Sequence, residues 1–236
     1  MTIKAIIRGN DYLFMTRFAS NEENRYYLKG VSVEPLSDTS VILAATTGSV
    51  LGCMRLNRQE GDAYGAGDKF ILAADKALIR AVMVKKNDNA TIVCREDRVD
   101  VYVTSFAAPQ IVEIVNGTAG IVPIASFPVS NMYIDGTFPN WRKVIPAGNV
   151  SSREGKHDTN AVYCSGIDPD LLALFRRDNE NPAISFDWDG VNPILVTNAD
   201  ERFLGVVMPH GNGMTRDSII GRKNWLLAEI KAQEAA

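Results

Sequence analysis

FPNWRKVIP, at residues 138–146, is the stretch that decides the fold. It follows a predicted strand and places Pro139 and Pro146 on either side of Trp141. Proline fixes its own φ and restricts the residue before it, so this run indicates an ordered junction. A second run, GVVMPH at residues 205–210, takes another predicted strand into a proline. We expect this part of the chain to be a hinge that is also part of a binding site.

The chain repeats the order strand, helix, strand, strand, strand three times. The first copy is predicted as strand 3–7, a helix capped by Asn10 or Asp11 that ends near residue 19, and strands 25–33, 40–46 and 49–56. The second is strand 69–73, a helix at 75–86 capped by Asp75, a hairpin of strands 91–97 and 98–105, and strand 121–134. The third is strand 160–166, a helix opened by Asp168 and Pro169, strands 183–190 and 192–198 around a turn at Asp189 and Gly190, and strand 201–209. This internal repeat predicts an α+β fold built from βαβββ modules.

The composition is that of an ordinary globular chain and argues against several classes of protein. Of the 236 residues, 46% are hydrophobic and 22% are charged, and no apolar run reaches the length of about 18 that a membrane span needs. The first residues lack the apolar core and cleavage site of a signal peptide, so we expect a cytoplasmic protein. The formal net charge of −3 argues against a surface that is basic all over but leaves room for a basic stripe.

The cysteines and histidines do not match a metal or catalytic motif. The cysteines are far apart in apolar or strand-like runs, which favours buried free thiols; they are Cys53, Cys94 and Cys164. The two histidines, His157 and His210, have no paired ligand spacing, so we expect no metal and no cofactor. The glycines near residue 65 lack the context of a dinucleotide loop, and Ser49 is not in a nucleophile elbow. We therefore predict a protein that is not an enzyme and has no catalytic residue.

Four runs occur in an order that resembles a known family. They are RYYLKGV at residues 25–31, LAATTGSVLG at 43–52, and the runs at 138–146 and 205–210. In the bacterial β sliding clamp, the β subunit of DNA polymerase III, RYYLNG, a T-D-G-H-R-L-A segment, FPDYxRVxP and a terminal VVMPMRL occur in the same order. The resemblance implies a DNA-clamp fold, with antiparallel sheets outside and helices on the inner face of a ring.

The resemblance also implies a domain organisation. Residues 1–147 resemble the central domain of the clamp, residues 148–212 resemble the second half of its last domain, and its first domain has no counterpart. Residues 213–236 lie beyond the point at which chains of the family usually end, and are expected to form a C-terminal helical extension. The apolar stripe of this extension comprises Ile219, Ile220, Trp225, Leu226, Leu227 and Ile230. It is expected to pack on its own chain, to dock on a neighbouring subunit or to block a binding pocket.

A basic inner wall is the first site that the resemblance implies, because a clamp must slide along duplex DNA without gripping it. The residues expected to face double-stranded DNA are Arg17, Arg25, Lys76, Arg80, Lys85, Lys86, Arg176 and Arg177. Charge alone favours the alternative that they are only the solvated faces of amphipathic helices, with some placed near C-terminal carbonyl groups. The resemblance favours DNA for the helix residues, and Arg25 has the weakest support.

A pocket for short, mostly apolar partner peptides is the second implied site. Its expected lining is Leu28, Thr46, Gly48, Leu51, Pro139, Lys143, Val144, Val206, Val207, Met208 and Pro209. Where clamps have Asp-Gly-His-Arg-Leu, this chain has TGSVL at residues 47–51, so the rim is less polar and the peptide preference is expected to differ. The alternative is that these residues are only the core of a domain junction.

The function implied is that of a shortened, divergent DNA sliding clamp. Such a protein would be a processivity or tethering factor in DNA replication, a homo-oligomer around duplex DNA that binds a polymerase or other proteins through short peptides. One alternative is an interaction module without a ring, a decoy or adaptor that binds clamp partners. An alternative of another class is a ligand-binding or hydrolytic β-rich domain, which a polar cleft with converging Asp, Ser and His would support.

Overall fold

The computed structural model describes residues 2–37, 39–57, 63–65, 67–83, 89–104, 120, 122–145, 167–176, 184–187 and 193–209. The first module comprises β1 (Ile3–Arg8), α1 (Gly9–Thr16), β2 (Gly30–Ser37), β3 (Ser40–Thr46) and β4 (Val50–Asn57), with a 3₁₀ helix η1 (Glu23–Leu28) before β2. After the short strand β5 (Ala63–Gly65), the second module comprises β6 (Phe70–Ala73), α2 (Lys76–Val82), β7 (Asn89–Arg95), β8 (Arg98–Thr104) and β9 (Ala125–Pro128). Next come α4 (Val129–Met132), β10 (Tyr133–Ile134) and a 3₁₀ helix η3 (Trp141–Val144). The third module contributes α5 (Pro169–Ala173), β11 (Ser185–Asp187), β12 (Ile194–Thr197) and β13 (Phe203–Val207).

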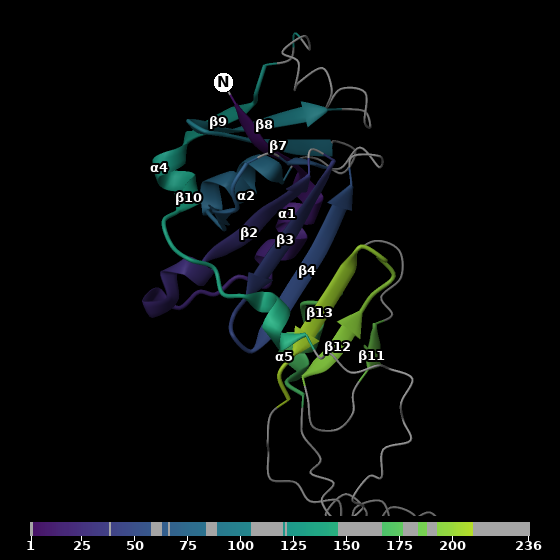
Figure 1. Ribbon diagram of the computed structural model, residues 1–236. Helices are drawn as coiled ribbons and strands as arrows, with labels where there is room; N and C mark the ends of the chain where they lie inside the picture. The colour runs from purple at the N-terminus through teal and green to yellow at the C-terminus, as the bar shows by residue number, and fades with distance from the viewer. Residues whose placement is uncertain are drawn as a thin grey trace, which may run out of the picture.

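The described strands form two antiparallel sheets in which the first two modules exchange their first strands. The five-stranded sheet has the order β5-β1-β7-β8-β9, so β1 pairs with β7 of the second module. The eight-stranded sheet has the order β10-β6-β2-β3-β4-β13-β12-β11, so β6 pairs with β2 of the first module. Figure 1 shows the smaller sheet above the larger one, and α1 packs against α2 and strands of both sheets. The exchange ties the two modules into one unit.

The third module extends the larger sheet rather than forming a sheet of its own. β13 pairs with β4 from Phe203 opposite Met54 to Val207 opposite Val50, and β12 and β11 follow outward. Its helix α5 begins as the sequence predicts, because the Asp168 carboxylate accepts a hydrogen bond from the backbone N–H of Asp170 at 2.9 Å. The predicted strand at residues 160–166 and the turn at Asp189 and Gly190 lie outside the described residues.

The main core lies between the sheets and on the helix-bearing face of the larger sheet. Phenylalanine rings from the first and third modules meet there. The Phe18 centroid is 5.5 Å from that of Phe14 and 5.1 Å from that of Phe175. Phe203 of β13 completes the group, with its centroid 5.0 Å from that of Phe14. Gly205 lies under these rings, where an added Cβ would be 2.0 Å from Cε1 of Phe175. The glycine therefore lets α5 approach β13 closely.

The two helices of the first two modules begin in different ways. Asp75 caps α2 as predicted, since its carboxylate accepts from the backbone N–H groups of Ala77 at 2.7 Å and Leu78 at 3.2 Å. The predicted cap of α1 is wrong. The helix begins at Gly9 without a side-chain cap, and Asp11 is instead buried with its Oδ1 3.5 Å from Nη2 of Arg202. The guanidinium of Arg202, in the third module, thus lies beside the Asp11 carboxylate that the sequence pattern assigned to the helix cap.

Two of the predicted strands are also corrected. Residues 25–28 form the end of η1, not the start of a strand, because the carbonyl groups of Tyr26 and Leu28 accept local hydrogen bonds from the N–H groups of Lys29 and Ser20. The predicted strand at residues 121–134 is divided into β9, α4 and β10, and Pro128 is the residue at which the ladder with β8 ends. Aromatic and β-branched residues favour strands at both places. Local backbone hydrogen bonds at the first place and Pro128 at the second determine the observed structure instead.

Asp100 on β8 is the most heavily bonded buried acid of the described residues. Its carboxylate accepts hydrogen bonds from Ser126 Oγ at 2.7 Å, Arg95 Nε at 2.9 Å and Arg98 Nε at 3.0 Å. Burial opposes ionisation, but the hydrogen bonds from Ser126, Arg98 and Arg95 lower the pKa of Asp100 below its ordinary value. This carboxylate therefore joins β7, β8 and β9 as an anion.

We expect Asp100→Asn to lower the free energy of unfolding at neutral pH by about 2 kcal/mol, because the two guanidinium groups lose their charged acceptor. Since the folded-state pKa is depressed, the contribution is complete above the ordinary carboxyl pKa of about 3.9 and is lost as the pH falls through the folded value. Urea denaturation from pH 7 to pH 3 measures both. A difference between the two proteins that stayed constant down to pH 3 would contradict the assignment.

Candidate functional site

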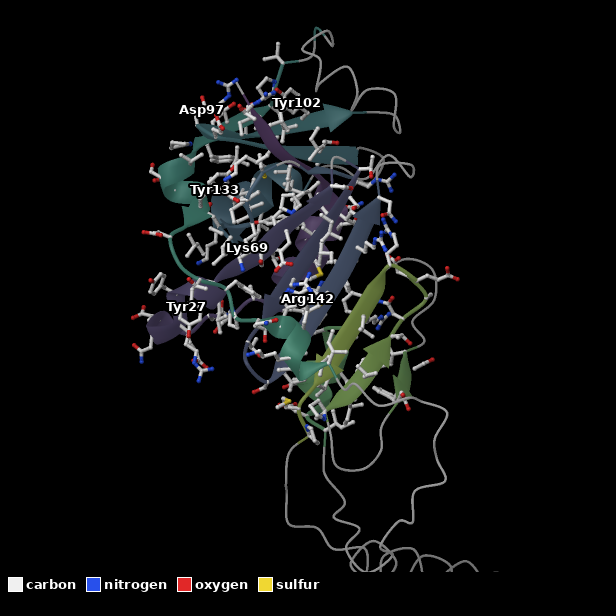
Figure 2. All side chains as sticks on the ribbon, in the orientation of Figure 1. Tyr27, Lys69, Asp97, Tyr102, Tyr133 and Arg142 are labelled. Atoms are coloured by element: carbon white, nitrogen blue, oxygen red, sulfur yellow. The ribbon has the colours of Figure 1, made fainter. Side chains whose placement is uncertain are left out.

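A second, smaller core covers the face of the larger sheet that is turned away from the helices. Its members alternate along the strands with those of the main core: Leu51 and Val206 face it, whereas Val50 and Val207 face the main core. Leu28 of η1 and Trp141 of η3 close this second core. Figure 2 labels Tyr27 and Arg142, which belong to η1 and η3, the two segments that lie against this part of the sheet.

A hollow of about 310 Å³ opens beside the second core. Its walls come from η1, the turn between β3 and β4, the segment that enters η3, and the end of β13. The lining residues are Arg25, Tyr27, Leu28, Thr46, Gly48, Ser49, Val50, Leu51, Pro139, Asn140, Trp141, Val144, Val206 and Met208. Apolar walls with a few polar groups suit a small apolar ligand or a short peptide.

The turn between β3 and β4 is held rigid by its own side chains. Thr46 Oγ1 donates to the Val50 carbonyl at 2.6 Å and accepts from the Gly48 N–H at 2.9 Å. Gly48 has a φ of 99°, which favours glycine, and an added Cβ would lie 2.8 Å from Nη1 of Arg25. The Met208 N–H donates to the Ser49 carbonyl at 2.9 Å, so the end of β13 is fixed to the same turn.

The opposite wall is fixed by the partly buried carboxylate of Glu34. Trp141 Nε1 donates to Glu34 Oε1 at 3.1 Å, and Arg142 Nη2 lies 2.8 Å from Glu34 Oε2. The Arg142 guanidinium also lies over the Trp141 ring, 4.1 Å from its centroid. Trp141 and Arg142 thus each contact one oxygen of Glu34 on β2, which fixes residues 138–145 against the sheet.

The structure brings together most of the predicted pocket residues. Those that line the hollow are Leu28, Thr46, Gly48, Leu51, Pro139, Val144, Val206 and Met208. Three do not line it: Val207 faces the main core on the other side of the sheet, Lys143 is exposed on η3, and Pro209 follows Met208 outside the lining. Sequence reasoning missed Tyr27, Ser49, Val50, Asn140 and Trp141 as lining residues. All but Trp141 adjoin a predicted residue, so inclusion of the neighbours along each run would have found them, whereas only the place of Trp141 between basic residues of the FPNWRKVIP run could have indicated it.

The predicted DNA-facing residues divide between the two faces. α1 lies between α2 and α5: Gly9 at its start meets Val82 of α2, and at its end Arg17 Nη1 donates to the Arg176 carbonyl at 2.7 Å. The exposed basic residues of this helix row are Arg17, Lys76, Arg80 and Arg176. Arg25 lies instead in the wall of the hollow, on the other side of the sheet. Lys85, Lys86 and Arg177 lie outside the described residues.

The other reactive groups are placed in the interior. Burial raises the pKa of both the Cys53 and Cys94 thiols to about 12, so both are protonated at neutral pH and are buried free thiols as predicted. Cys164 and both histidines lie outside the described residues. In the described part of the chain, no three His, Cys, Asp or Glu side chains are grouped to hold a metal ion, and no helix has the length and apolar character needed to cross a membrane.

Antiparallel sheets, modules that exchange their first strands and helices on one face define an α+β fold of the DNA-clamp type. Solved structures that share it include the β subunit of the DNA polymerase of Streptococcus pyogenes, with 13% identity and a TM-score of 0.54 over 86% of this chain and 64% of that chain. The sliding clamp of Bartonella birtlesii bound to griselimycin has 19% identity and a TM-score of 0.53 over 86% of this chain and 64% of that chain. The DNA polymerase III β subunit of Thermotoga maritima has 14% identity and a TM-score of 0.52 over 87% of this chain and 65% of that chain.

The chain thus has the fold of the bacterial sliding clamps and spans a little under two-thirds of the length of each of these three. No protein-family model and no curated protein matches it. The clamp resemblance drawn from the four sequence runs is confirmed at the level of the fold.

Proposed function

We propose that the protein is a sliding-clamp-like tether that associates with itself around duplex DNA and holds partner proteins by short apolar peptides. The observation that carries the proposal is the placement of the two sites on opposite faces of one sheet. The basic helix row lies on one face, and the hollow lies on the other. A tether needs this separation, because its partner must bind outside while DNA passes inside.

The helix row suits a sliding contact with DNA. Its cations lie on α2 or just after the ends of α1 and α5, three helices from three modules, and the protein as a whole carries a net charge of −3. Long basic side chains that reach phosphates without base contacts attract a duplex but do not fix its register. The acidic remainder of the surface limits binding elsewhere, so the geometry favours one basic stripe as the DNA face.

A ring requires more than one copy of the chain. The sequence holds three modules, and the domain boundary proposed near residue 147 assigns two of them to one domain and one to a half-domain. Copies related by rotational symmetry can close a hole that a single copy leaves open. Light scattering over a range of concentrations measures the solution mass. A dimer or larger assembly supports the ring, and a strict monomer supports the adaptor that binds partners without encircling DNA.

The DNA face is tested by reversing two of its charges. We expect Arg80→Glu together with Arg176→Glu to weaken association with duplex DNA at least tenfold near 0.1 M salt, because attraction to phosphate becomes repulsion. The slope of log affinity against log salt is expected to fall in magnitude by about 1.8 per copy that contacts DNA, from about 0.9 for each lost phosphate contact. Fluorescence anisotropy with a labelled duplex measures both quantities.

A matched control has the same change in net charge. Lys69→Glu with Lys143→Glu reverses two exposed cations that are on neither α1, α2 nor α5. It is expected to lower affinity much less, through long-range charge alone. Equal effects of the two double variants across all salt concentrations would refute the helix row as the DNA face.

A further inference from the structure

We propose that the third module pairs with the third module of a second copy of this chain, and that the two complete one another as the first two modules do. The inference rests on the proposed self-association and names the surface that carries it. It begins from a count: the first two modules form one unit by exchange of strands, and the 236 residues hold three modules. One module is therefore left over.

Strand exchange is the rule by which the modules pair. The first strand of each module pairs with the second strand of the other, β1 with β7 and β6 with β2, so the first and second strands of one module lie in different sheets. The second strand of the third module is β11, which pairs with β12 on one side. Among the described strands none pairs with its other side, and Figure 1 shows β11 outermost at that end of the larger sheet. This edge is where the first strand of another module belongs.

Phe186 on β11 shows that a core is left incomplete at this edge. It lies opposite Val196, a member of the main core, so its side chain points to the helix-bearing face of the sheet. It is nevertheless 48% exposed. On the equivalent strands, Val33 of β2 and Ile92 of β7 point to the same core and are both 0% exposed, because the partner module covers them. Phe186 lacks the cover that a partner module gives.

The row of helices ends at α5, and α5 is the least enclosed of the three module helices. α1 buries five of its residues, and α2 buries Leu78 and Val82. No residue of α5 is buried, and its Leu171 and Leu172 are only partly covered by the main core. α1 and α2 pack on one another. A further helix that packed on α5 in the same way would cover the two leucines.

A second copy supplies both missing parts at once. The sequence predicts the first strand of the third module at residues 160–166. Since a first strand joins the second strand of the other module, this run of one copy is the counterpart of β11 in the other. The two α5 helices would then pack together as α1 and α2 do, over the leucines and Phe186. A surface that both lends a strand and receives one is what a two-fold dimer requires.

The predicted C-terminal helix within residues 213–236 is the competing occupant. Its apolar stripe would cover Phe186 and the leucines of α5. A helix uses its backbone N–H and carbonyl groups internally, however, and cannot extend the edge of a sheet. The open side of β11 therefore favours a module with a strand to lend.

Sedimentation analysis of the full chain over a range of concentrations measures the assembly, and the unaltered protein is expected to form a dimer or a larger even-numbered assembly. Phe186→Asp is expected to raise the dissociation constant of the dimer roughly a hundredfold, because the contact would bury a carboxylate without a partner. The side chain is half exposed in the single copy, so the far-ultraviolet circular dichroism spectrum is expected to stay unchanged. Phe186→Ala adds no charge and is expected to raise the constant roughly tenfold, which keeps the test decisive if the aspartate variant does not fold.

Leu36→Asp is the matched control. Leu36 lies on β2 of the same sheet and is 50% exposed, so it accepts the same charge at almost the same exposure in the first module. It is expected to leave the assembly unchanged. Equal masses for Phe186→Asp, Leu36→Asp and the unaltered protein at every concentration would overturn the inference.

Photo-cross-linking identifies what lies against Phe186. The photoreactive amino acid p-benzoylphenylalanine takes the place of Phe186, and copies labelled with heavy nitrogen are mixed with unlabelled copies before illumination. We expect cross-linked peptides that join a labelled chain to an unlabelled one, with the partner peptide drawn from residues 160–176. Mass spectrometry of the digested product identifies both peptides.

The contrary outcomes separate the inference from the proposed function. A cross-link to residues 213–236 of the same chain would mean that the tail covers this face, and the inference would be wrong. Copies that associate but cross-link Phe186 to another module would also overturn it, while the proposed self-association would stand. A strict monomer without cross-links between copies would remove both.

Discussion

Met208→Glu is expected to lower the affinity for an apolar peptide at least a hundredfold while the thermal midpoint Tm stays unchanged. The Met208 side chain lines the hollow and is 41% exposed, so a carboxylate there remains hydrated in the free protein. The fixed hydrogen bond to Ser49 is made by the Met208 backbone N–H and survives the substitution. A bound apolar anchor would have to remove water from the new charge, which is costly. Isothermal titration calorimetry measures the loss with an acetylated and amidated neutral pentapeptide that has Gln first and Leu and Phe as anchors.

The choice of Met208 over Leu51 follows from burial. Sequence reasoning predicts that a charge at either position leaves the fold intact, but Leu51 is only 3% exposed within the second core, so a charge there is expected to unfold the protein. Val122→Glu is the matched control, because Val122 is an apolar residue that is 78% exposed outside the lining. It is expected to bind peptide normally. Normal binding by Met208→Glu would place the peptide somewhere else.

Gly205→Ala is expected to destabilise the protein by about 3 kcal/mol, the largest effect on stability of any single methyl group considered. The new Cβ would lie 2.0 Å from Cε1 of Phe175, whose ring is fully buried and packed against Phe18 and Phe203. The ring cannot rotate away without displacing its neighbours, so α5 must separate from β13. Urea denaturation monitored by circular dichroism measures the change.

A rescue and a control make this prediction specific. In a Phe175→Leu background, Gly205→Ala is expected to lower the free energy of unfolding by less than it does in the unaltered protein, because a smaller side chain leaves room for the methyl group. Gly120→Ala adds the same methyl group where no atom lies within 4 Å, and is expected to change stability by less than about 0.5 kcal/mol. Equal stability of Gly205→Ala and the unaltered protein would mean that α5 does not pack on β13.

Much of the fold could be predicted because its signals are local. Asp75 and Asp168 cap helices by accepting hydrogen bonds from N–H groups two or three residues along the chain, and β3 has the bounds that its apolar run predicts. The errors arise where a distant group competes. Asp11 has the sequence pattern of a cap, yet Arg202 of the third module draws it into the interior. No rule that considers one segment at a time can include that partner.

The candidate site was predictable in outline for a different reason. The four motif runs supply all of its walls, but which side of a strand a residue faces depends on the pleat. Val206 and Val207 are chemically identical, and only the alternation along β13 sends the first toward the hollow and the second into the main core. The resemblance predicts that Arg25 faces DNA, because the RYYLKGV run matches clamp residues next to the DNA path. Its position in η1, which composition had predicted as strand, puts it at the hollow instead.

The exchange of β1 and β6 between modules also governs how the chain is made. β1 has its longest ladder with β7, so the chain must emerge from the ribosome through Arg95 before its first strand can complete that pairing. Until then, apolar residues of β1 such as Ile6 and Ile7, which are fully buried in the finished protein, have no native cover. Contacts so distant in sequence slow folding and expose nascent chains to aggregation. We therefore expect the first module to stay open to aggregation during synthesis until the second module is complete.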